Sequence, residues 1–306
     1  MRTEADLLDE IRGRIAAHAR PDLRTPIAGL LLSRVETSAP DHSLTEPLLV
    51  VMAQGGKRLL LGAQVFEYRA GQCLVVGTDL PVSGHFVGAS PQHPSLAVGL
   101  ELRPAAIAPL LLETGARRRW SRNSAGPPAI ATGDAGVDLL DAVARLLRLL
   151  EQPTDAPVLA PLIEREILWR LLTGPYGAMV RQVGLADSGL SQVSRAIRWI
   201  RDNYAEPMRI SDLADLVGLS PSAFHRHFRD VTTMSPLQFQ KRIRLQEARS
   251  LLVARAGEVA RVGHLVGYDS PTQFNREYRR LFGAPPGQDA ARLRADAEPH
   301  DVRSLP

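Results

Sequence analysis

Two histidines separated by one residue form a candidate metal-binding pair. His225 and His227 lie on either side of Arg226 in the run AFHRHFRD, residues 223–230. On a helix that turns about 100° per residue, the two imidazoles lie about 200° apart, whereas a helical pair that shares a metal is spaced i, i+4. The same rotation places the two phenylalanines of the run on one buried stripe and His225 and Arg226 on a polar face. The pattern therefore predicts a surface helix and no metal site.

Other residues that could carry chemistry are isolated along the chain. A cupin-type metal-dependent enzyme would need clustered histidines and a carboxylate, but His42, His85 and His93 stand apart, so we expect them in loops or at the surface. Cys73, the single cysteine, lies in the strand-like run AGQCLVVG, where a small apolar core residue is expected. A redox or electrophile sensor, or a suicide alkyl-transfer protein, would instead need Cys73 as an activated thiolate. The sequence predicts no enzyme, no metal and no cofactor, and these alternatives stay open.

The polar helix belongs to a repeated element. The segments ISDLADLVGLSPSAFHRHFRDVTTMSP, 210–236, and EVARVGHLVGYDSPTQFNREYRRLFGAPP, 258–286, both read as helix, glycine, Ser-Pro helix start and two aromatic residues four apart. Glycine suits the left-handed end of a helix, and serine followed by proline suits a helix start. This is the helix-turn-helix pattern, in which the second helix enters the major groove of DNA. Two copies in one chain predict a DNA-binding module.

Charge is concentrated in the same part of the chain. Residues 190–294 carry 17 basic and 10 acidic side chains, whereas residues 1–189 carry 19 and 20. A basic third beside a neutral remainder indicates that a polyanion-binding module is attached to another domain. A length of 306 residues also suits two domains. The lone cysteine and the acidic, polar start predict a cytoplasmic protein, and no apolar run approaches the roughly 20 residues of a membrane helix.

The remaining elements follow from hydrophobic periodicity. Residues 4–19 predict an amphipathic helix, and residues 27–103 alternate short apolar runs with turns, which predicts about eight antiparallel strands. Gly55-Gly56 and Gly62-Ala63 are expected to be hairpin turns. Two leucine-rich helices follow between 137 and 173, and residues 116–134 read as loop. A helix from 236 to 254 would be roughly 28 Å long at about 1.5 Å per residue, and it could hold two recognition helices about 34 Å apart, one groove repeat.

The segment 195–292 resembles the DNA-binding domain of the AraC/XylS family of transcription regulators. The resemblance lies in the paired motifs, the run RLQEARSLL and the run VGYDSPTQFNREYRRLFGAPP. The stretch beginning TPIAGLLLSRVETSAPDHSL resembles the regulatory domain of one subgroup. The resemblance implies a cupin-like barrel that senses an effector and helices that dimerise the chain. By this resemblance, the positions that read bases are Ser222, His225, Arg226, Thr272, Gln273 and Arg276, and Pro271 stands where some members carry a polar reader.

These observations predict an α+β multidomain protein. It has an N-terminal cupin-like antiparallel β-barrel with flanking helices, and a C-terminal all-α domain with two helix-turn-helix motifs joined by a long helix. The predicted divisions are an N-terminal helix, 1–24; a barrel, 25–110; a helical dimerisation region, 111–183; a linker, 184–194; the DNA-binding domain, 195–294 (motifs at about 211–231 and 258–282); and a disordered tail, 295–306. Arg229, Arg279 and Arg280 are expected to contact phosphate. The expected partners are double-stranded DNA, a small-molecule effector whose site residues stay unknown, a second copy of the chain and RNA polymerase, with no membrane.

Overall fold

The first domain is built on two antiparallel β-sheets. The computed structural model describes residues 2–38, 40–113, 128–185, 189–254 and 258–296. One sheet has the strand order β1-β8-β3-β6-β9 and the other the order β2-β7-β4-β5. The strands are β1 (Leu30–Val35), β2 (Asp41–Leu44), β3 (Leu48–Gln54), β4 (Gly56–Leu61), β5 (Gln64–Arg69), β6 (Gln72–Val76), β7 (Pro81–Phe86), β8 (Ser95–Glu101) and β9 (Ile130–Asp134).

The continuous apolar run of β3 is explained by burial on both faces of the five-stranded sheet. Leu49 and Val51 point to a helical layer, whereas Val50 and Met52 point into the core shared with the second sheet. Because successive side chains of a strand point to opposite faces, both faces need apolar residues here. The strand therefore does not alternate between apolar and polar residues.

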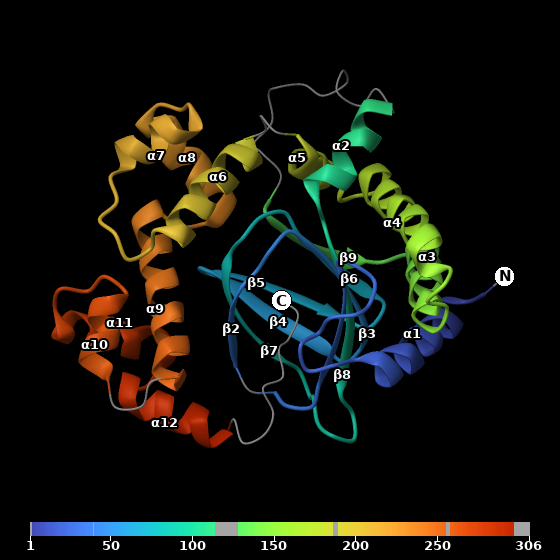
Figure 1. Cartoon of the computed structure of the whole chain (residues 1–306), viewed down its shortest axis with the longest axis horizontal. Helices are drawn as coiled ribbons and strands as arrows, with labels where there is room; N and C mark the ends of the chain where they lie inside the picture. The colour runs from blue at the N-terminus through green and yellow to red at the C-terminus, as the bar shows by residue number, and fades with distance from the viewer. Residues whose placement is uncertain (1, 39, 114–127, 186–188, 255–257, 297–306) are drawn as a thin grey trace.

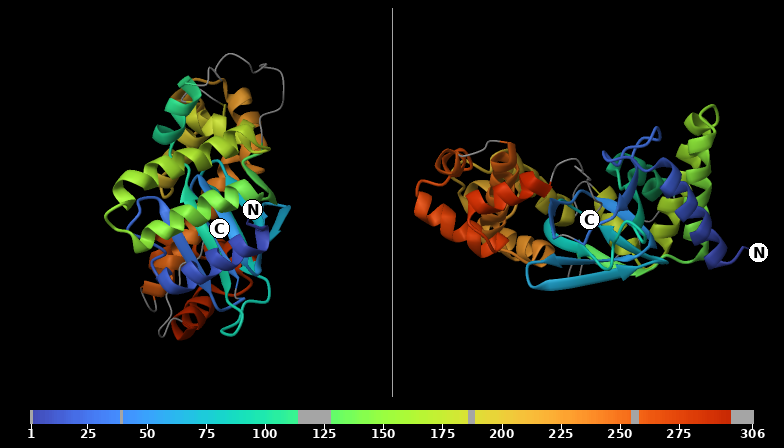
Figure 2. Two further views of the ribbon diagram at one scale, coloured as in Figure 1. Left: turned by 90° about the vertical axis from the view of Figure 1, so that its right-hand side faces the viewer. Right: turned by 90° about the horizontal axis from the view of Figure 1, so that it is seen from below.

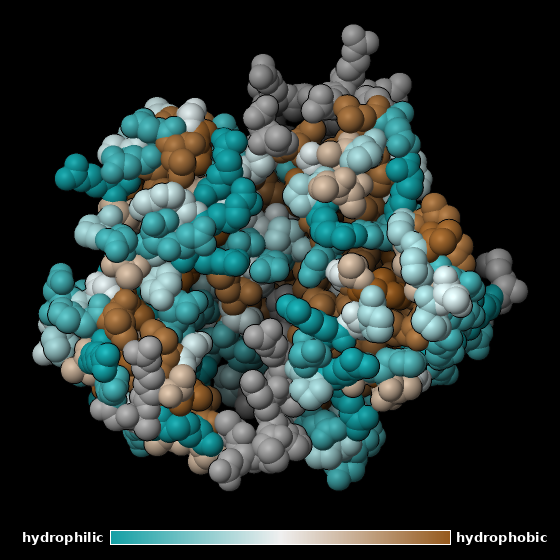
Figure 3. Space-filling view, viewed as in Figure 1, coloured by the Kyte–Doolittle hydropathy of each residue, from teal (hydrophilic) through white to brown (hydrophobic). Residues whose placement is uncertain are grey.

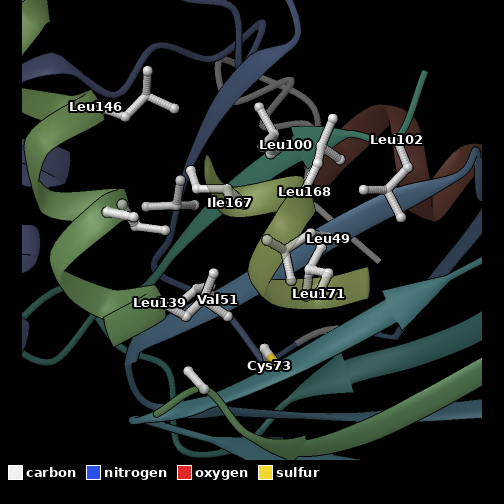
Figure 4. Packing of buried hydrophobic residues seen from close by; sticks show 14 of the residues in the cluster. Leu49, Val51, Cys73, Leu100, Leu102, Leu139, Leu146, Ile167, Leu168 and Leu171 are labelled. Carbon is white, nitrogen blue, oxygen red and sulfur yellow. The ribbon is translucent and has the colours of Figure 1, made fainter. Parts of the chain in front are cut away.

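The helical layer covers the outer face of the five-stranded sheet (Figures 1 and 2). It consists of α1 (Glu4–His18), α3 (Val137–Arg148), a short 3-10 turn (Leu149–Glu151) and α4 (Ala156–Thr173), with α2 (Pro104–Glu113) and α5 (Gly177–Gly184) at one end. Figure 4 shows Leu139 and Leu146 of α3 and Leu168 and Leu171 of α4 packed towards strand residues such as Val51. The leucine stripe of α3 is thus buried inside the chain. At the start of α1, Thr3 and Asp6 form a reciprocal capping box.

The second domain is entirely helical in its described part. It contains α6 (Gly189–Asp202), α7 (Ile210–Val217), α8 (Pro221–Thr232), α9 (Pro236–Ala254), α10 (Val259–Leu265), α11 (Pro271–Phe282) and α12 (Pro286–Asp296). In Figure 1, α9 runs between the α7–α8 pair and the α10–α11 pair, on the opposite side of the β domain from α1, α3 and α4. The predicted fold class, an antiparallel β domain followed by an all-α domain with two helix-turn-helix motifs, is confirmed.

Several local predictions differ from the structure. Gly62 lies in the β4–β5 hairpin as predicted, but Gly55 joins strands of different sheets, so it is not in a hairpin turn. Residues 130–134, expected to be loop, form β9 and pair with β6. The second half of the predicted linker, from Gly189 onward, is the first part of α6. The predicted disordered tail begins inside α12, and its residues after Asp296 lie outside the described part of the chain.

Candidate nucleic-acid interface

The first motif is formed by α7 and α8, and local chemistry sets the turn between them. α7 ends at Gly218, whose φ of 72° lies in the left-handed region that glycine adopts without strain. α8 then starts at Pro221, and the hydroxyl of Ser220 accepts a hydrogen bond from the backbone N–H of Ala223 at 3.3 Å. The left-handed conformation of Gly218 and the Ser220 cap together set the angle between α7 and α8.

The second motif repeats the arrangement with α10 and α11. Gly267 has a φ of 86°, and a Cβ atom there would lie 2.3 Å from the carbonyl oxygen of Ala205, so no other residue fits. The hydroxyl of Ser270 accepts from the N–H of Gln273 at 3.3 Å, with Pro271 as the first helical residue. Both helix starts predicted from the Ser-Pro pairs are present.

Buried aromatic residues hold each second helix against its domain. Phe224 and Phe228 of α8 are fully buried, and Phe228 also contacts Phe239 of α9, with ring centroids 5.4 Å apart. Phe274 and Tyr278 of α11 are equally buried. Because these positions are spaced i, i+4, they fix the rotation of each helix about its axis.

That rotation exposes the polar residues selected from the sequence. The exposed positions are Ser222, His225, Arg226 and Arg229 on α8, and Thr272, Gln273, Arg276, Arg279 and Arg280 on α11. The two histidines of α8 do not form a pair, because His225 is exposed whereas Nδ1 of His227 is buried without a hydrogen-bond partner in the described part of the protein. Gln273 already donates to Glu277 at 3.3 Å, so its amide must leave this carboxylate before it can contact a base.

The two motifs are tied together by a side chain that the sequence analysis did not single out. Arg244 of α9 donates to the carbonyl oxygen of Tyr204 at 2.6 Å, before the first motif, and to that of Gly267 at 2.7 Å, in the turn of the second. Burial lowers the pKa of Arg244, although nearby acidic groups oppose this. The guanidinium satisfies several loop carbonyls at once, which keeps the loop before α7 and the turn of the second motif in a defined relation to α9.

A second unforeseen group anchors α11. The carboxylate of Asp289 in α12 is fully buried and accepts from Arg249 Nε at 2.8 Å, from the Tyr278 hydroxyl at 3.0 Å and from Arg292 Nη2 at 2.6 Å. Burial raises the pKa of Asp289, but the hydrogen bonds and charge of Arg249, together with the hydrogen bonds from Tyr278 and Arg292, outweigh it, and the pKa lies below its usual value. An acidic residue in the first turn of a helix that begins with proline is a weak sequence signal for such a role, and the distant Arg249 gives none.

The helical domain is docked on the β domain through α9. Arg242 Nη2 donates to the Ser83 hydroxyl at 3.2 Å, and the same hydroxyl lies 2.7 Å from Nδ1 of His42. Gln246 Nε2 donates to the carbonyl oxygen of Ser43 at 3.3 Å, and the ring of His42 packs edge-on against Phe282 at 4.9 Å. The contact leaves the polar faces of α8 and α11 exposed.

The residues behind the alternative functions are engaged in packing. Cys73 is buried in β6, its thiol donates to the Tyr176 hydroxyl at 3.3 Å, and burial raises its pKa to about 11, although the Tyr176 hydrogen bond opposes the shift. A thiol with this pKa is protonated at neutral pH and is a poor nucleophile. His42 contacts Ser83 and Phe282, and no group of three metal-ligating side chains occurs among the residues that the structure describes.

One buried cation in the β domain was not anticipated. The ammonium of Lys57 in β4 is fully buried, lies 3.6 Å from Asp41 and sits 4.4 Å from the centre of the Phe86 ring. Burial lowers the pKa of Lys57 to about 8, although the Asp41 carboxylate opposes the shift. No described helix long and apolar enough to cross a bilayer is present.

Comparison with known proteins gives family matches over both domains. Residues 26–179, half of the chain, match the model of the AraC-type transcriptional regulator N-terminus, and residues 213–292 match a helix-turn-helix domain. The HTH-type transcriptional activator RhaS of Escherichia coli O1:K1 is 27% identical over 148 residues, which is 48% of this chain and 53% of RhaS. The chain thus spans about half the length of the curated relatives that it matches.

The fold also matches solved structures. ToxT from Vibrio cholerae has a TM-score of 0.56 at 9% identity, covering 86% of this chain and 97% of ToxT. ToxT bound to an unsaturated fatty acid has a TM-score of 0.51 at 7% identity, covering 87% of this chain and 96% of ToxT. At these identities the likeness establishes the two-domain fold.

Proposed function

Because this chain belongs to the AraC-type family of transcriptional regulators, we propose that it is a sequence-specific DNA-binding regulator controlled by a small-molecule effector. The observation that carries the proposal is the pair of exposed polar faces on α8 and α11, each held by a capped turn and a buried aromatic pair. Catalysis is not part of the proposal. Since such a protein acts where the chromosome lies, we place it in the cytoplasm.

The proposed base-reading residues are Ser222, His225, Arg226, Thr272, Gln273 and Arg276. Arginine can donate two parallel hydrogen bonds to guanine, and glutamine can pair with adenine. Arg229, Arg279 and Arg280 lie nearer the ends of their helices, and we assign them to phosphate. α9 has the length to hold α8 and α11 in successive major grooves on one side of the duplex.

Selection of binding sites from random duplexes, followed by fluorescence anisotropy, tests this function. Arg276→Ala should weaken binding to the selected site by about 1–3 kcal/mol and relax the preference at one base pair, whereas Arg279→Ala should weaken all sites equally. Arg34→Ala, an exposed arginine on β1, is the matched control and should change nothing. If no duplex binds even at low salt, the DNA-binding function is refuted; equal weakening by Arg276→Ala at every site would make Arg276 a phosphate contact.

We further propose a homodimer formed through α4. Val158, Leu162 and Trp169 are 67%, 60% and 42% exposed, and at about 100° per residue they lie within about 40° of one another on the helix. Figure 3 shows apolar surface on this side of the molecule, over the region of α3 and α4. An apolar helix face of this kind favours a partner helix. The buried stripe of α3 cannot serve this purpose, so α4 is the better candidate.

The dimer is tested by light scattering during gel filtration. Leu162→Glu should convert the dimer to a monomer, because a carboxylate would be buried in the interface. Val65→Glu is the control, since Val65 is also exposed but lies on β5. A wild-type monomer at all concentrations, or an unchanged dimer in Leu162→Glu, would contradict the assignment.

The proposals of effector control and of transcriptional activation are supported by the names of the similar proteins. ToxT has been solved with an unsaturated fatty acid bound, and the matched curated proteins are named transcriptional activators. These names support a small-molecule effector and contact with RNA polymerase. Transcription from a promoter that carries the selected site, with and without added chain, measures the direction of regulation.

A further inference from the structure

A cleft lies where the first helix of the DNA-binding domain meets the first domain. Its volume is about 850 Å³, within the roughly 300–1,000 Å³ of small-molecule sites. One wall is α6, and the other is formed by the turns before β3 and β7, the junction of β8 with α2 and the end of α5. Figure 1 shows α6, α5 and α2 gathered at this end of the molecule. We call it the interdomain cleft.

The face of α6 that lines the interdomain cleft is polar and basic. Its lining residues are Leu190, Ser191, Ser194, Arg195, Arg198, Arg201 and Asp202. At about 100° per residue they span about 140° of the helix surface. The opposite face, with Val193, Ala196, Ile197 and Ile200, is buried in the core of the DNA-binding domain. The arginines are therefore placed in the cleft by the same periodicity that builds that core.

Two of the three arginines form no ion pair in the described part of the chain, although the charge of Asp79 acts on Arg198. Arg201 pairs with Asp79 at 3.2 Å and lies 3.6 Å from Glu46. Among the residues that the structure describes, Arg195 and Arg198 make no ion pair, and Arg195 donates only to the carbonyl oxygen of Val217 at 3.5 Å.

The acidic side chains of the cleft are accounted for in other ways. Glu46 and Asp79 lie beside Arg201. Arg103 forms its ion pair with Glu164 at 2.6 Å, and the charge of Glu101 adds a smaller interaction with Arg103. Asp202 is exposed at the C-terminal end of α6. Two guanidinium groups on neighbouring turns thus remain available to an anion, and arginine binds carboxylates through paired hydrogen bonds.

The opposite wall carries apolar side chains beside the carboxylates of Glu46, Asp79 and Glu101. Leu102, Pro104, Ala108 and Val183 line it, with Leu190 between the walls. A ligand that fits both walls needs a negatively charged group for α6 and a hydrocarbon body for this surface. We infer that the interdomain cleft binds a small organic carboxylate with an apolar body, and that this is the effector site of the proposed regulator.

The position of the cleft explains how such a ligand would act on DNA binding. Ser194 of α6 bonds to Thr78 of the first domain at 2.7 Å, beside the Arg201–Asp79 pair, so the cleft is crossed by contacts between the two domains. A carboxylate bound to α6 and resting on the opposite wall adds a further link. If the two domains adopt more than one relative orientation, the ligand would favour the orientation that binds it more tightly. The size of the shift equals the difference between the ligand's binding free energies for the two orientations. This inference rests on the proposed function.

The experiment uses the full chain and sodium octanoate as the probe, with octanamide as its uncharged counterpart. Calorimetry should show one octanoate bound per chain, with octanamide at least roughly tenfold weaker because it lacks the charge. Arg195→Gln/Arg198→Gln should lower octanoate affinity at least roughly tenfold. Arg209→Gln, an exposed arginine outside the cleft, is the matched control and should bind octanoate as the wild type does.

DNA binding separates this inference from the proposed function. The double variant should still bind the selected duplex, but octanoate should no longer change its affinity. No octanoate binding, or unchanged binding in the double variant, overturns the site even if DNA binding is normal. If the double variant loses DNA binding and octanoate has no effect on the wild type, the two arginines belong to the DNA contact and the site is overturned as well. If octanoate binds as expected but no duplex does, the proposed function fails and the ligand site stands.

Discussion

Asp289→Asn should loosen the second recognition helix without changing the shape of its anchor. The buried carboxylate joins Arg249 of α9, Tyr278 of α11 and Arg292 of α12. The amide has nearly the same volume, but it carries no charge and offers one oxygen where the carboxylate offers two. Arg249, whose side chain is only 14% exposed, would then be a buried cation without its counter-ion.

The expected cost is about 3 kcal/mol, the low end of the range for breaking a buried ion pair, because Arg292 is 59% exposed and adds little. Since about 1.4 kcal/mol is a tenfold change, amide hydrogen exchange in α11 should become roughly a hundredfold faster. The stability that Asp289 contributes is present above its usual pKa of 3.8 and is lost as the pH falls below it, because its pKa is lowered in the folded chain.

Hydrogen exchange measured by mass spectrometry on the full chain gives the opening free energy helix by helix. Asp230→Asn, an exposed carboxylate on α8, is the control and should change stability by less than about 0.5 kcal/mol. The reasoning is refuted if Asp289→Asn costs less than about 1 kcal/mol, or if Asp289→Asn costs as much in an Arg249→Met background as in the wild type.

Three further perturbations probe other parts of the structure. Burial, with repulsion from Arg249, lowers the pKa of His42 from 6.5 to about 4; stability should therefore be full above pH 6.5 and fall by about 3 kcal/mol as the pH approaches 4, and thermal unfolding of His42→Asn should show a flatter pH profile. Because Cys73 is buried and its pKa is about 11, a thiol reagent at pH 7 should label it only as fast as the β domain opens, and rapid labelling of native protein would contradict its burial. Ser270→Ala should cost about 1 kcal/mol by removing the N-cap of α11, whereas Ser270→Asp, which keeps an acceptor, should cost less in the same unfolding experiment.

Local sequence patterns were sufficient to predict the two helix-turn-helix motifs. The Ser-Pro pairs, the glycines at 218 and 267 and the aromatic residues four apart act within one or two turns of helix, so their consequences can be worked out without knowing the rest of the fold. The rotation that exposes Arg226 and Arg276 follows from the burial of Phe224 and Phe274. α9 occupies Pro236–Ala254, the span predicted from its flanking proline and its periodicity.

Contacts between distant segments were decided only by the tertiary structure. β9 is a strand because its backbone pairs with β6, although its own residues, IATGD, have little strand character. Gly55 lies where the chain passes from one sheet to the other. In the sequence this connection resembles a hairpin turn, because each of the two has glycine between apolar runs. Arg244 and Asp289 differ from ordinary surface charges only in the partners that folding brings to them. Helix caps and periodicity depend on neighbours along the chain, whereas strand pairing, buried charge networks and the interdomain cleft depend on residues tens to hundreds of positions apart, and no local pattern records them.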